Sequence, residues 1–195
     1  MFLSRILERS KNSKVGKVLF APVHASERAY ITFLNKLRAD SFDTMAATLG
    51  RNHEVTLPEA SAISNFINVA TGRGHLGPQL EKAAQGLNTI FFAPRYLTSR
   101  FEMLAGQPMY SGTMGTRSLI AKEYARTLVG LGTMYALAKA AGAELESDPR
   151  SSDFGKIKVG NTRIDPLMGL SQSTVLLSRL ATGQIKHEDG DVSNI

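Results

Sequence analysis

The chain has 195 residues, with an apolar share of 43% and a charged share of 21%, which is ordinary for a globular protein and excludes wholesale disorder. Cysteine is absent, so a disulfide framework, a cysteine-based zinc site and a cysteine nucleophile are excluded. The formal net charge is +6, and the crowding of cations at the start of the chain favours a polyanionic partner.

Residues 1–24 form a basic arm. The cations that we expect to contact nucleic acid or another polyanion are Arg5, Arg9, Lys11, Lys14 and Lys17. A basic arm is the usual footprint of such a partner. No aromatic residue interleaves these charges as a stacking platform would, so a solvated terminus that orders only against a partner is the alternative.

Six stretches have apolar residues at three- or four-residue spacing, which is typical of helices that bury one face. They predict helices over residues 26–49, 58–71, 78–90, 94–104, 114–143 and 168–182. Ser26 is the expected N-cap of the first helix, and Gly50 and Gly183 are expected stops. The fifth helix is apolar nearly all round, which predicts burial on most sides.

A single β-hairpin is predicted at about residues 156–165, because alternating strands flank Gly160 and Asn161 in a two-residue turn. Its apolar side, with Ile157, Val159 and Ile164, is expected to lie on the helices. The fold class is therefore mainly α: a helical bundle of about five or six helices with one small hairpin. Residues 25–185 form one helical domain, and residues 186–195 form an acidic, flexible tail.

Gly132, Ala136 and Ala140 lie four residues apart on one face of the fifth helix. Small residues at this spacing allow two helices to approach closely, in membranes or in protein cores. The favoured interpretation is a tightly packed core helix. A membrane-active helix, exposed by a conformational change, is the alternative, so membrane contact is not favoured.

Two further groups of charged residues are candidates for contact. Arg95 and Arg100 lie on the helix that begins at Pro94, and we expect them to bind a polyanion. The loop before the hairpin is dense in charge, and a partner is expected to meet Asp148, Arg150, Asp153 and Lys156. The alternative for this loop is a connector in which the aspartates hold Arg150 or Lys156.

The sequence predicts no catalytic, metal or cofactor site. Residues 72–77 match GxGxxG, but a helix precedes them and no acidic residue follows at the ribose-binding position. We expect a glycine-rich turn between helices, with an anion held by backbone amides beside Arg73 as the alternative. The histidines lack metal-ligand spacing, and no nucleophile elbow surrounds a serine. The chain is therefore not expected to be an enzyme.

Four stretches carry a resemblance to a known family. They are residues 26–40 (Ser26-Glu27-Arg28-Ala29-Tyr30 into Phe33-Leu34-Asn35-Lys36-Leu37-Arg38-Ala39-Asp40), 71–74 (Thr71-Gly72-Arg73-Gly74), 91–100 (Phe91-Phe92-Ala93-Pro94-Arg95 with Ser99-Arg100) and 148–166 (Asp148-Pro149-Arg150 to Pro166). In this order they resemble a large polyvalent protein-associated domain, found toward the end of phage and prophage polyvalent proteins. The match covers roughly residues 25–185.

The resemblance implies a setting rather than a chemistry. Polyvalent proteins are thought to be packaged in the virion and delivered with the genome, and this helical domain has no assigned catalytic residues. We therefore expect a non-enzymatic virion component, internal (an ejection protein) or at the portal and neck. It would contact other virion proteins, sister copies in a homo-oligomer, and DNA, after a period in the host cytoplasm. The alternative is an early effector that docks on a host defence protein or polymerase.

Overall fold

The computed structural model describes residues 21–51, 53–78, 94–167 and 169–195. Its helices are α3 (Ala21–Leu49), α4 (Leu57–Ala70), α7 (Pro94–Leu104), the 3-10 turn η1 (Gln107–Tyr110), α8 (Met114–Ala140) and α9 (Leu170–Thr182). Its strands are β1 (Glu144–Leu145), β2 (Ile157–Val159), β3 (Thr162–Ile164), β4 (Gln184–Lys186) and β5 (Val192–Asn194). The expected mainly α fold with a small hairpin is confirmed. The helix predicted over 78–90 and the five cations of the basic arm lie outside the described residues.

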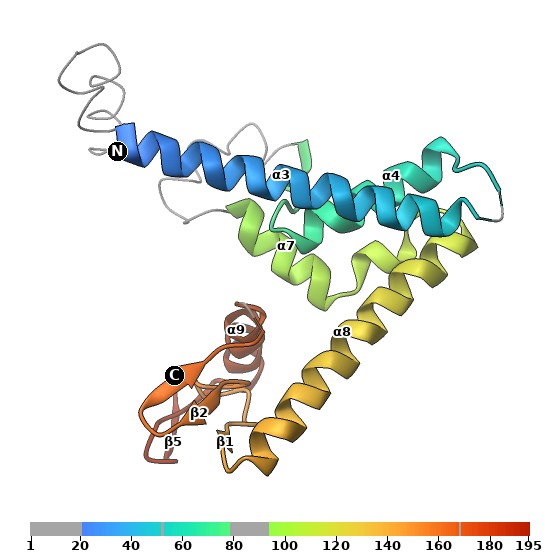
Figure 1. Ribbon diagram of the computed structural model, residues 1–195. Coiled ribbons are helices and arrows are strands. Elements are labelled where there is room, and N and C mark those ends of the chain that lie inside the picture. The colour runs from blue at the N-terminus through green and yellow to red at the C-terminus, as the bar shows by residue number, and fades with distance from the viewer. Residues whose placement is uncertain (1–20, 52, 79–93, 168) are drawn as a thin grey trace.

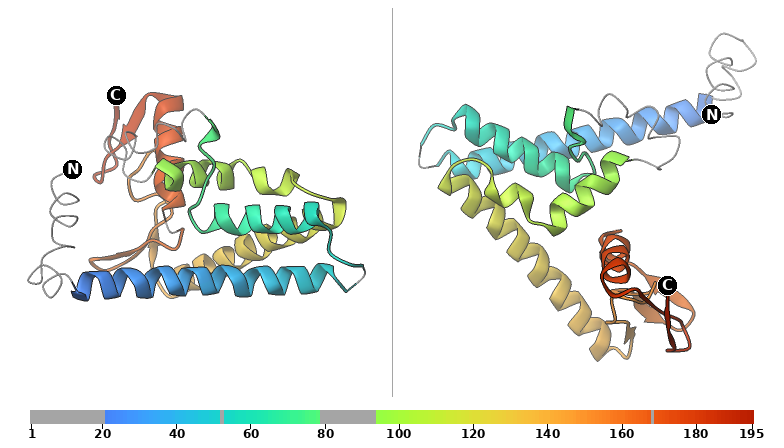
Figure 2. Two further views of the ribbon diagram at one scale, coloured as in Figure 1. Left: turned by 90° about the horizontal axis from the view of Figure 1, so that it is seen from above. Right: turned by 180° about the vertical axis from the view of Figure 1, so that it is seen from behind.

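Three helices build the hydrophobic core. Met45 and Leu49 of α3, Ile63 and Ile67 of α4, and Leu119 and Ile120 of α8 form one buried cluster. Phe66 and Tyr124 pack at its edge with ring centroids 5.9 Å apart. Seen from above, α3 and α4 lie side by side, and α8 passes beneath them (Figure 2). The core therefore sits where the last turns of α3 meet α4 and the first turns of α8.

Local sequence sets most helix ends. Thr56 and Glu59 form a capping box at the start of α4, where Pro58 occupies the first turn. Thr113 caps α8 by accepting a hydrogen bond from the Thr116 N–H. At the end of α9, Gly183 adopts the left-handed conformation with φ 65°. The first helix differs from its prediction, because α3 already includes residues 21–25 and Ser26 lies inside it rather than at its N-cap.

The C-terminal part contains more strands than the sequence predicts. The expected β2–β3 hairpin is present, and β1 adds a third antiparallel strand beside β2. Ile157 is buried, but Val159 is 58% and Ile164 51% exposed, so the prediction that all three lie on the helices is wrong. Of these three side chains Ile157 alone is buried, although β2 also pairs with β1 and Arg163 of β3 pairs with Asp153 and Glu188.

The acidic end of the chain is not a loose tail. Residues 184–194 form a second antiparallel hairpin, β4–β5. The Lys186 amide donates to the Arg150 carbonyl at 3.3 Å, and the Ile195 amide donates to the Gly183 carbonyl at 2.8 Å. The first bond ties β4 to the loop that precedes β2, and the second ties the last residue to the start of the hairpin. The flexible tail expected for residues 186–195 is therefore replaced by an ordered hairpin.

Helix α8 links the helical core to the C-terminal strands (Figure 1). Its only buried residues are Thr116, Leu119 and Ile120, all in its first two turns. Farther along, Tyr124 donates a hydrogen bond to the Met103 carbonyl of α7, and burial raises the pKa of the Tyr124 hydroxyl to about 12. The second half of α8 is largely exposed, so the predicted burial on most sides is wrong within the described chain. Among the described residues, no helix is long and apolar enough to span a membrane.

Candidate interaction surfaces

The charged loop before β2 is held by its own ion pairs. The Arg150 guanidinium donates to both carboxylate oxygens of Asp148, at 3.1 Å and 2.8 Å, and to Gln184 Oε1 at 2.7 Å. The Arg150 side chain and then its backbone N–H lower the pKa of Asp148 to about 2. Asp148 and Arg150 therefore stabilise the junction between this loop and β4.

The second half of the loop is paired in the same way. Asp153 accepts a hydrogen bond from Lys156 Nζ at 2.8 Å and another from the Arg163 guanidinium. Lys156 and then Arg163 lower the pKa of Asp153, against the effect of burial. All four residues predicted to meet a partner thus hold one another or a neighbouring strand. A partner would have to dock on these pairs as they stand, or break them.

The basic residues of α7 are partly engaged inside the chain. The Arg100 guanidinium carbon lies 4.4 Å from the centre of the Tyr96 ring, a distance typical of a cation–π contact. Arg100 Nε is buried and has no hydrogen-bond partner among the described residues. Arg95 is exposed at the surface of α7. Of the two arginines predicted to bind a polyanion, Arg95 is the more accessible.

A second basic cluster lies at the end of α4 and was not predicted. Arg38 of α3 donates from Nε to the Thr71 hydroxyl at 2.8 Å and from its terminal nitrogen to the Thr71 carbonyl at 3.3 Å. Burial and the nearby charge of Arg73 lower the pKa of Arg38. The Arg38 guanidinium therefore caps the end of α4, with the positive charge of Arg73 nearby. These residues are 35 apart in sequence, so spacing alone could not bring them together.

The glycine-rich segment after α4 is a turn, as expected, and its amides are already used. The N–H groups of Gly72 and Arg73 donate to carbonyls of α4, and that of Gly74 donates to the Arg95 carbonyl at 3.0 Å. The His75 N–H donates to Glu102 Oε1 at 3.0 Å. With four successive amides satisfied in the chain, the alternative of an anion held by this loop is not supported. Gly74 instead lets the chain cross α7 closely, since a Cβ there would lie 2.3 Å from the Ser99 N.

A buried carboxylate joins the start of α4 to the start of α8. Glu59 accepts hydrogen bonds from the Thr56 N–H at 3.0 Å and from the Thr113 hydroxyl at 2.7 Å. His53 Nε2 lies 2.9 Å from the same carboxylate. These contacts, in the order Thr56, Thr113 and His53, lower the pKa of Glu59 to about 2. Because the carboxylate is saturated by caps of two helices, we assign it a structural role.

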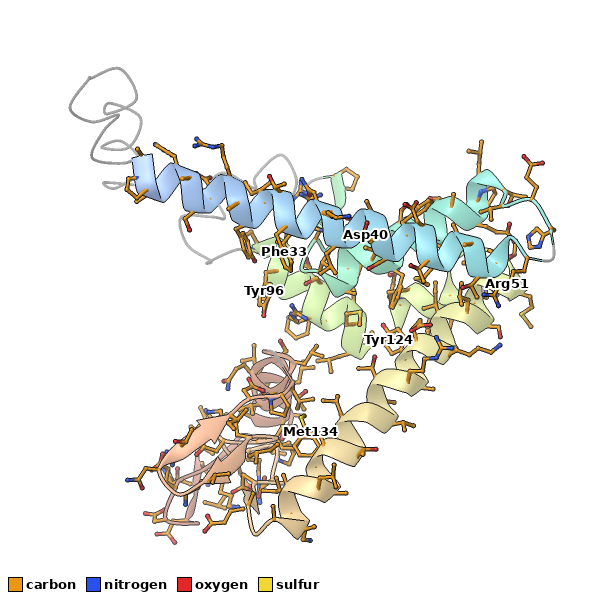
Figure 3. The ribbon with its side chains drawn as sticks, viewed as in Figure 1. Phe33, Asp40, Arg51, Tyr96, Tyr124 and Met134 are labelled. Carbon is orange, nitrogen blue, oxygen red and sulfur yellow. The ribbon has the colours of Figure 1, made fainter. Side chains whose placement is uncertain are left out.

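The second half of α8 exposes apolar side chains on more than one side. Leu128 is 67%, Val129 68% and Leu137 66% exposed. Gly132, Ala136 and Ala140 are exposed as well, and a Cβ at Gly132 would meet no atom within 4 Å. The predicted packing of these three small residues inside the core of the chain is therefore wrong. Figure 3 shows this half of α8 with Met134 toward the C-terminal strands and its other side uncovered by any described element.

Two depressions flank α8. One, of about 490 Å³, lies on the outer side and is lined by Lys122, Ala125, Arg126, Val129 and Gly130. The other, of about 470 Å³, lies where α8 meets α3 and α4, and its apolar lining comes from Met45, Phe66, Ile67 and Ala70. Both suit packing of a side chain or helix better than acid–base chemistry. No group of three His, Cys, Asp or Glu residues in the described part of the chain could hold a metal ion.

Comparison with known proteins gives no match. No protein-family model matches the chain. No curated protein and no solved structure matches it either. The surfaces described above are therefore interpreted from their own residues.

Proposed function

We propose that this chain is a non-enzymatic component of a bacteriophage virion, internal or at the portal and neck, that works by binding other proteins. The observation that carries the protein-binding part is the exposure of Leu128, Val129 and Leu137 on α8. These residues belong to the stretch 128–138, which carries no charged side chain, and extended exposed apolar surface marks protein interaction sites. The phage setting rests on the resemblance to the polyvalent protein-associated domain.

The state of the polar groups supports binding rather than catalysis. Carboxylates at a reaction centre need a free position for substrate and a proton affinity matched to their task. Here Glu59, Asp148 and Asp153 are saturated by hydrogen bonds and ion pairs that lower their pKa values. Such groups stay ionised and hold structure, which is what a rigid binding module needs.

DNA contact is the second part of the proposal. Arg95 of α7 and the Arg38–Arg73 cluster add cations to those of the basic arm. A phosphate contact releases counterions, so the binding constant for double-stranded DNA should fall steeply as salt rises from about 50 to 200 mM. Binding that is absent, or that does not respond to salt, would remove DNA from the proposed function and leave the protein contacts.

Quantitative mass spectrometry of gradient-purified phage particles, set beside infected-cell lysate, tests the virion assignment. We expect the chain at a fixed copy number per particle, since a virion component is built in stoichiometrically. Detection in lysate alone would contradict the assignment. It would then favour an early effector, and the next step would be to identify a host protein that co-purifies with the chain soon after infection.

A further inference from the structure

The second half of α8 has an amino-acid pattern that its surroundings do not explain. Residues 128–138 contain no charged side chain. A helix that is apolar all round is normally buried. One side of this segment does face the C-terminal part, where the Tyr135 hydroxyl donates to the Gly155 carbonyl. The outer side carries Val129, which is 68% exposed and faces no described element, whereas Leu128, seven residues before Tyr135, lies at the edge of the covered side.

The exposed side also has a symmetric arrangement of residues. Besides the exposed Lys122, Arg126 and Lys139, this side carries six small or apolar residues, all exposed: Ala121, Ala125, Val129, Gly132, Ala136 and Ala140. Their spacings of four, four, three, four and four read the same in both directions about the point between Gly130 and Leu131. An interface between two identical chains with a two-fold axis must be complementary to itself. Two antiparallel copies of this pattern meet that condition.

We propose that α8 pairs with α8 of a second copy of this chain, antiparallel and about a two-fold axis near Gly130 and Leu131. This inference rests on the proposed protein-binding function and names its first partner. In this register Val129 faces Gly132 of the other copy, and Ala125 faces Ala136. Lys122 lies about 25 Å along the helix axis from its counterpart, since each residue adds about 1.5 Å. The same register sets Lys122 level with Lys139 of the other copy, whereas a parallel pair would set Lys122, Arg126 and Lys139 each level with its own counterpart.

The outer depression supplies the packing contact. Lys122, Ala125, Arg126 and Val129, which line it, are spaced i, i+3, i+4 and i+7. Four residues at this spacing form the hole that receives one side chain of a facing helix. In the antiparallel register Ala136 of the second copy, which is level with Ala125, faces this hole. A small side chain at the centre of the seam, Gly132, lets the two backbones approach closely.

The size of the surface indicates how strong the pair is. The segment from Ala121 to Ala140 has 20 residues and is about 30 Å long. One face of such a helix falls short of the ~800 Å² per partner that a standard stable interface buries. We therefore expect a reversible dimer rather than a permanent assembly.

Sedimentation velocity over a concentration series from low to high micromolar tests the pairing. We expect a monomer–dimer equilibrium for the natural sequence and at least tenfold weaker association for Val129→Glu, because two carboxylates would be buried beside the seam. Val159→Glu is the matched control, because Val159 is similarly exposed but lies on β2. Circular dichroism of each variant establishes that it is folded. A monomer at every concentration, or equal weakening by both substitutions, would overturn the proposal.

Disulfide cross-linking tests the register, and the absence of cysteine makes single substitutions unambiguous. Under mild oxidation, a mixture of Ala125→Cys and Ala136→Cys chains should form the mixed disulfide in preference to either homodimer. Homodimers of Ala125→Cys alone would show a parallel pair and overturn the antiparallel register. This result is independent of the virion assignment: a chain that dimerises through α8 but is absent from particles would sink the phage function and leave the pairing in place.

Discussion

At the scale of single residues, Glu59 has the most demanding environment. The carboxylate is buried, where an ionised group is costly unless hydrogen bonds compensate it. Its compensation comes from the ends of two helices, through Thr56 at the start of α4 and Thr113 at the start of α8. Thr56 and Glu59 have the spacing of a capping box, so the cap could have been predicted from sequence. The contact with Thr113, 54 residues away, could not.

Glu59 should make the protein sensitive to acid. Its pKa in the folded chain is about 2, below the ordinary value of about 4.3. A lowered pKa contributes stability that is fully present above the ordinary value and is lost as pH falls toward the folded value. We therefore expect the melting temperature to fall as pH drops from about 4.5 to 2, and Glu59→Gln to remove part of that slope. Thermal melts from pH 7 to pH 2 would measure it.

Glu59→Gln should also lower the melting temperature by several degrees at pH 7, because the charge-assisted hydrogen bonds from Thr56 and Thr113 weaken. Glu54→Gln is the matched control, since Glu54 is exposed and five residues away. An unchanged acid slope in Glu59→Gln would mean that the contacts at Glu59 do not set the pH dependence.

Gly74 shows a different constraint, one of space. A Cβ at this position would lie 2.3 Å from the Ser99 N and 2.8 Å from the Arg95 carbonyl oxygen. Both are backbone atoms of α7, so the helix itself would have to shift. We expect Gly74→Ala to reduce the free energy of unfolding by about 1–3 kcal/mol, the usual cost of overpacking. Urea denaturation would measure the loss.

The same substitution in α8 serves as the comparison. A Cβ at Gly130 meets nothing within 4 Å, and alanine favours a helix interior over glycine by about 0.8–1.0 kcal/mol. Gly130→Ala should therefore stabilise the chain. If both variants lost stability equally, the close crossing of Gly74 over α7 could not be the cause.

At the scale of elements, helix positions were more predictable than their burial. Periodicity and punctuation by Pro58, Pro94 and Gly183 located α4, α7 and α9 to within a few residues. Apolar character did not reveal that α8 is exposed in the single chain. Leu128 and Leu137 would have the same sequence pattern whether they packed against a helix of the same chain or against a helix of another copy. Strand β1 was missed for a different reason: two residues, Glu144 and Leu145, are too few to show an alternating pattern.

Tyr135 anchors the exposed half of α8 to the loop before β2. Its hydroxyl donates to the Gly155 carbonyl, and burial, followed by the charge of Asp165, raises its pKa. We expect Tyr135→Phe to lower the free energy of unfolding by about 0.5–1.5 kcal/mol, the typical net value of one hydrogen bond. Amide hydrogen exchange should quicken across β2 and β3, where the anchor is lost.

Alkali should act on the same contact. A raised pKa means that the stability from neutral Tyr135 is present below the ordinary tyrosine value of about 10 and is lost as pH rises above it.

For the hydrogen-exchange experiment, Tyr110→Phe is the matched control, since Tyr110 is 71% exposed. Equal exchange rates in the two variants would show that the Tyr135 hydroxyl does not hold α8 to the strands.

At the scale of the whole molecule, the sequence predicted the class of fold but not how its end is built. The acidic residues Glu188, Asp189 and Asp191 suggested a loose tail, yet Glu188 pairs with Arg163 and Lys186 pairs with Glu146. The second pair joins positions 40 apart. Charge composition predicts solvent contact, but only the three-dimensional path of the chain determines which opposite charges meet. For the loop before β2, the sequence left two alternatives open, contact with a partner or pairing of its aspartates with Arg150 or Lys156. The structure shows the second kind of pairing.

Pairing through α8 has a thermodynamic consequence for the whole chain. Association that favours the folded state stabilises it by about 2.7 kcal/mol when the partner is in hundredfold excess over its dissociation constant. For a chain of this size, each kcal/mol shifts the melting temperature by about 2–4 °C. We therefore expect the melting temperature to rise by about 5–10 °C as protein concentration increases from the low micromolar range by two orders of magnitude.

Differential scanning calorimetry of the natural chain should show this rise, and the Val129→Glu variant should not show it. Since Val129 is 68% exposed in the single chain, both proteins should melt at nearly the same temperature at the lowest concentration. A difference there would mean that the substitution damages the fold itself, and a concentration-independent melting temperature in the natural chain would contradict the dimer.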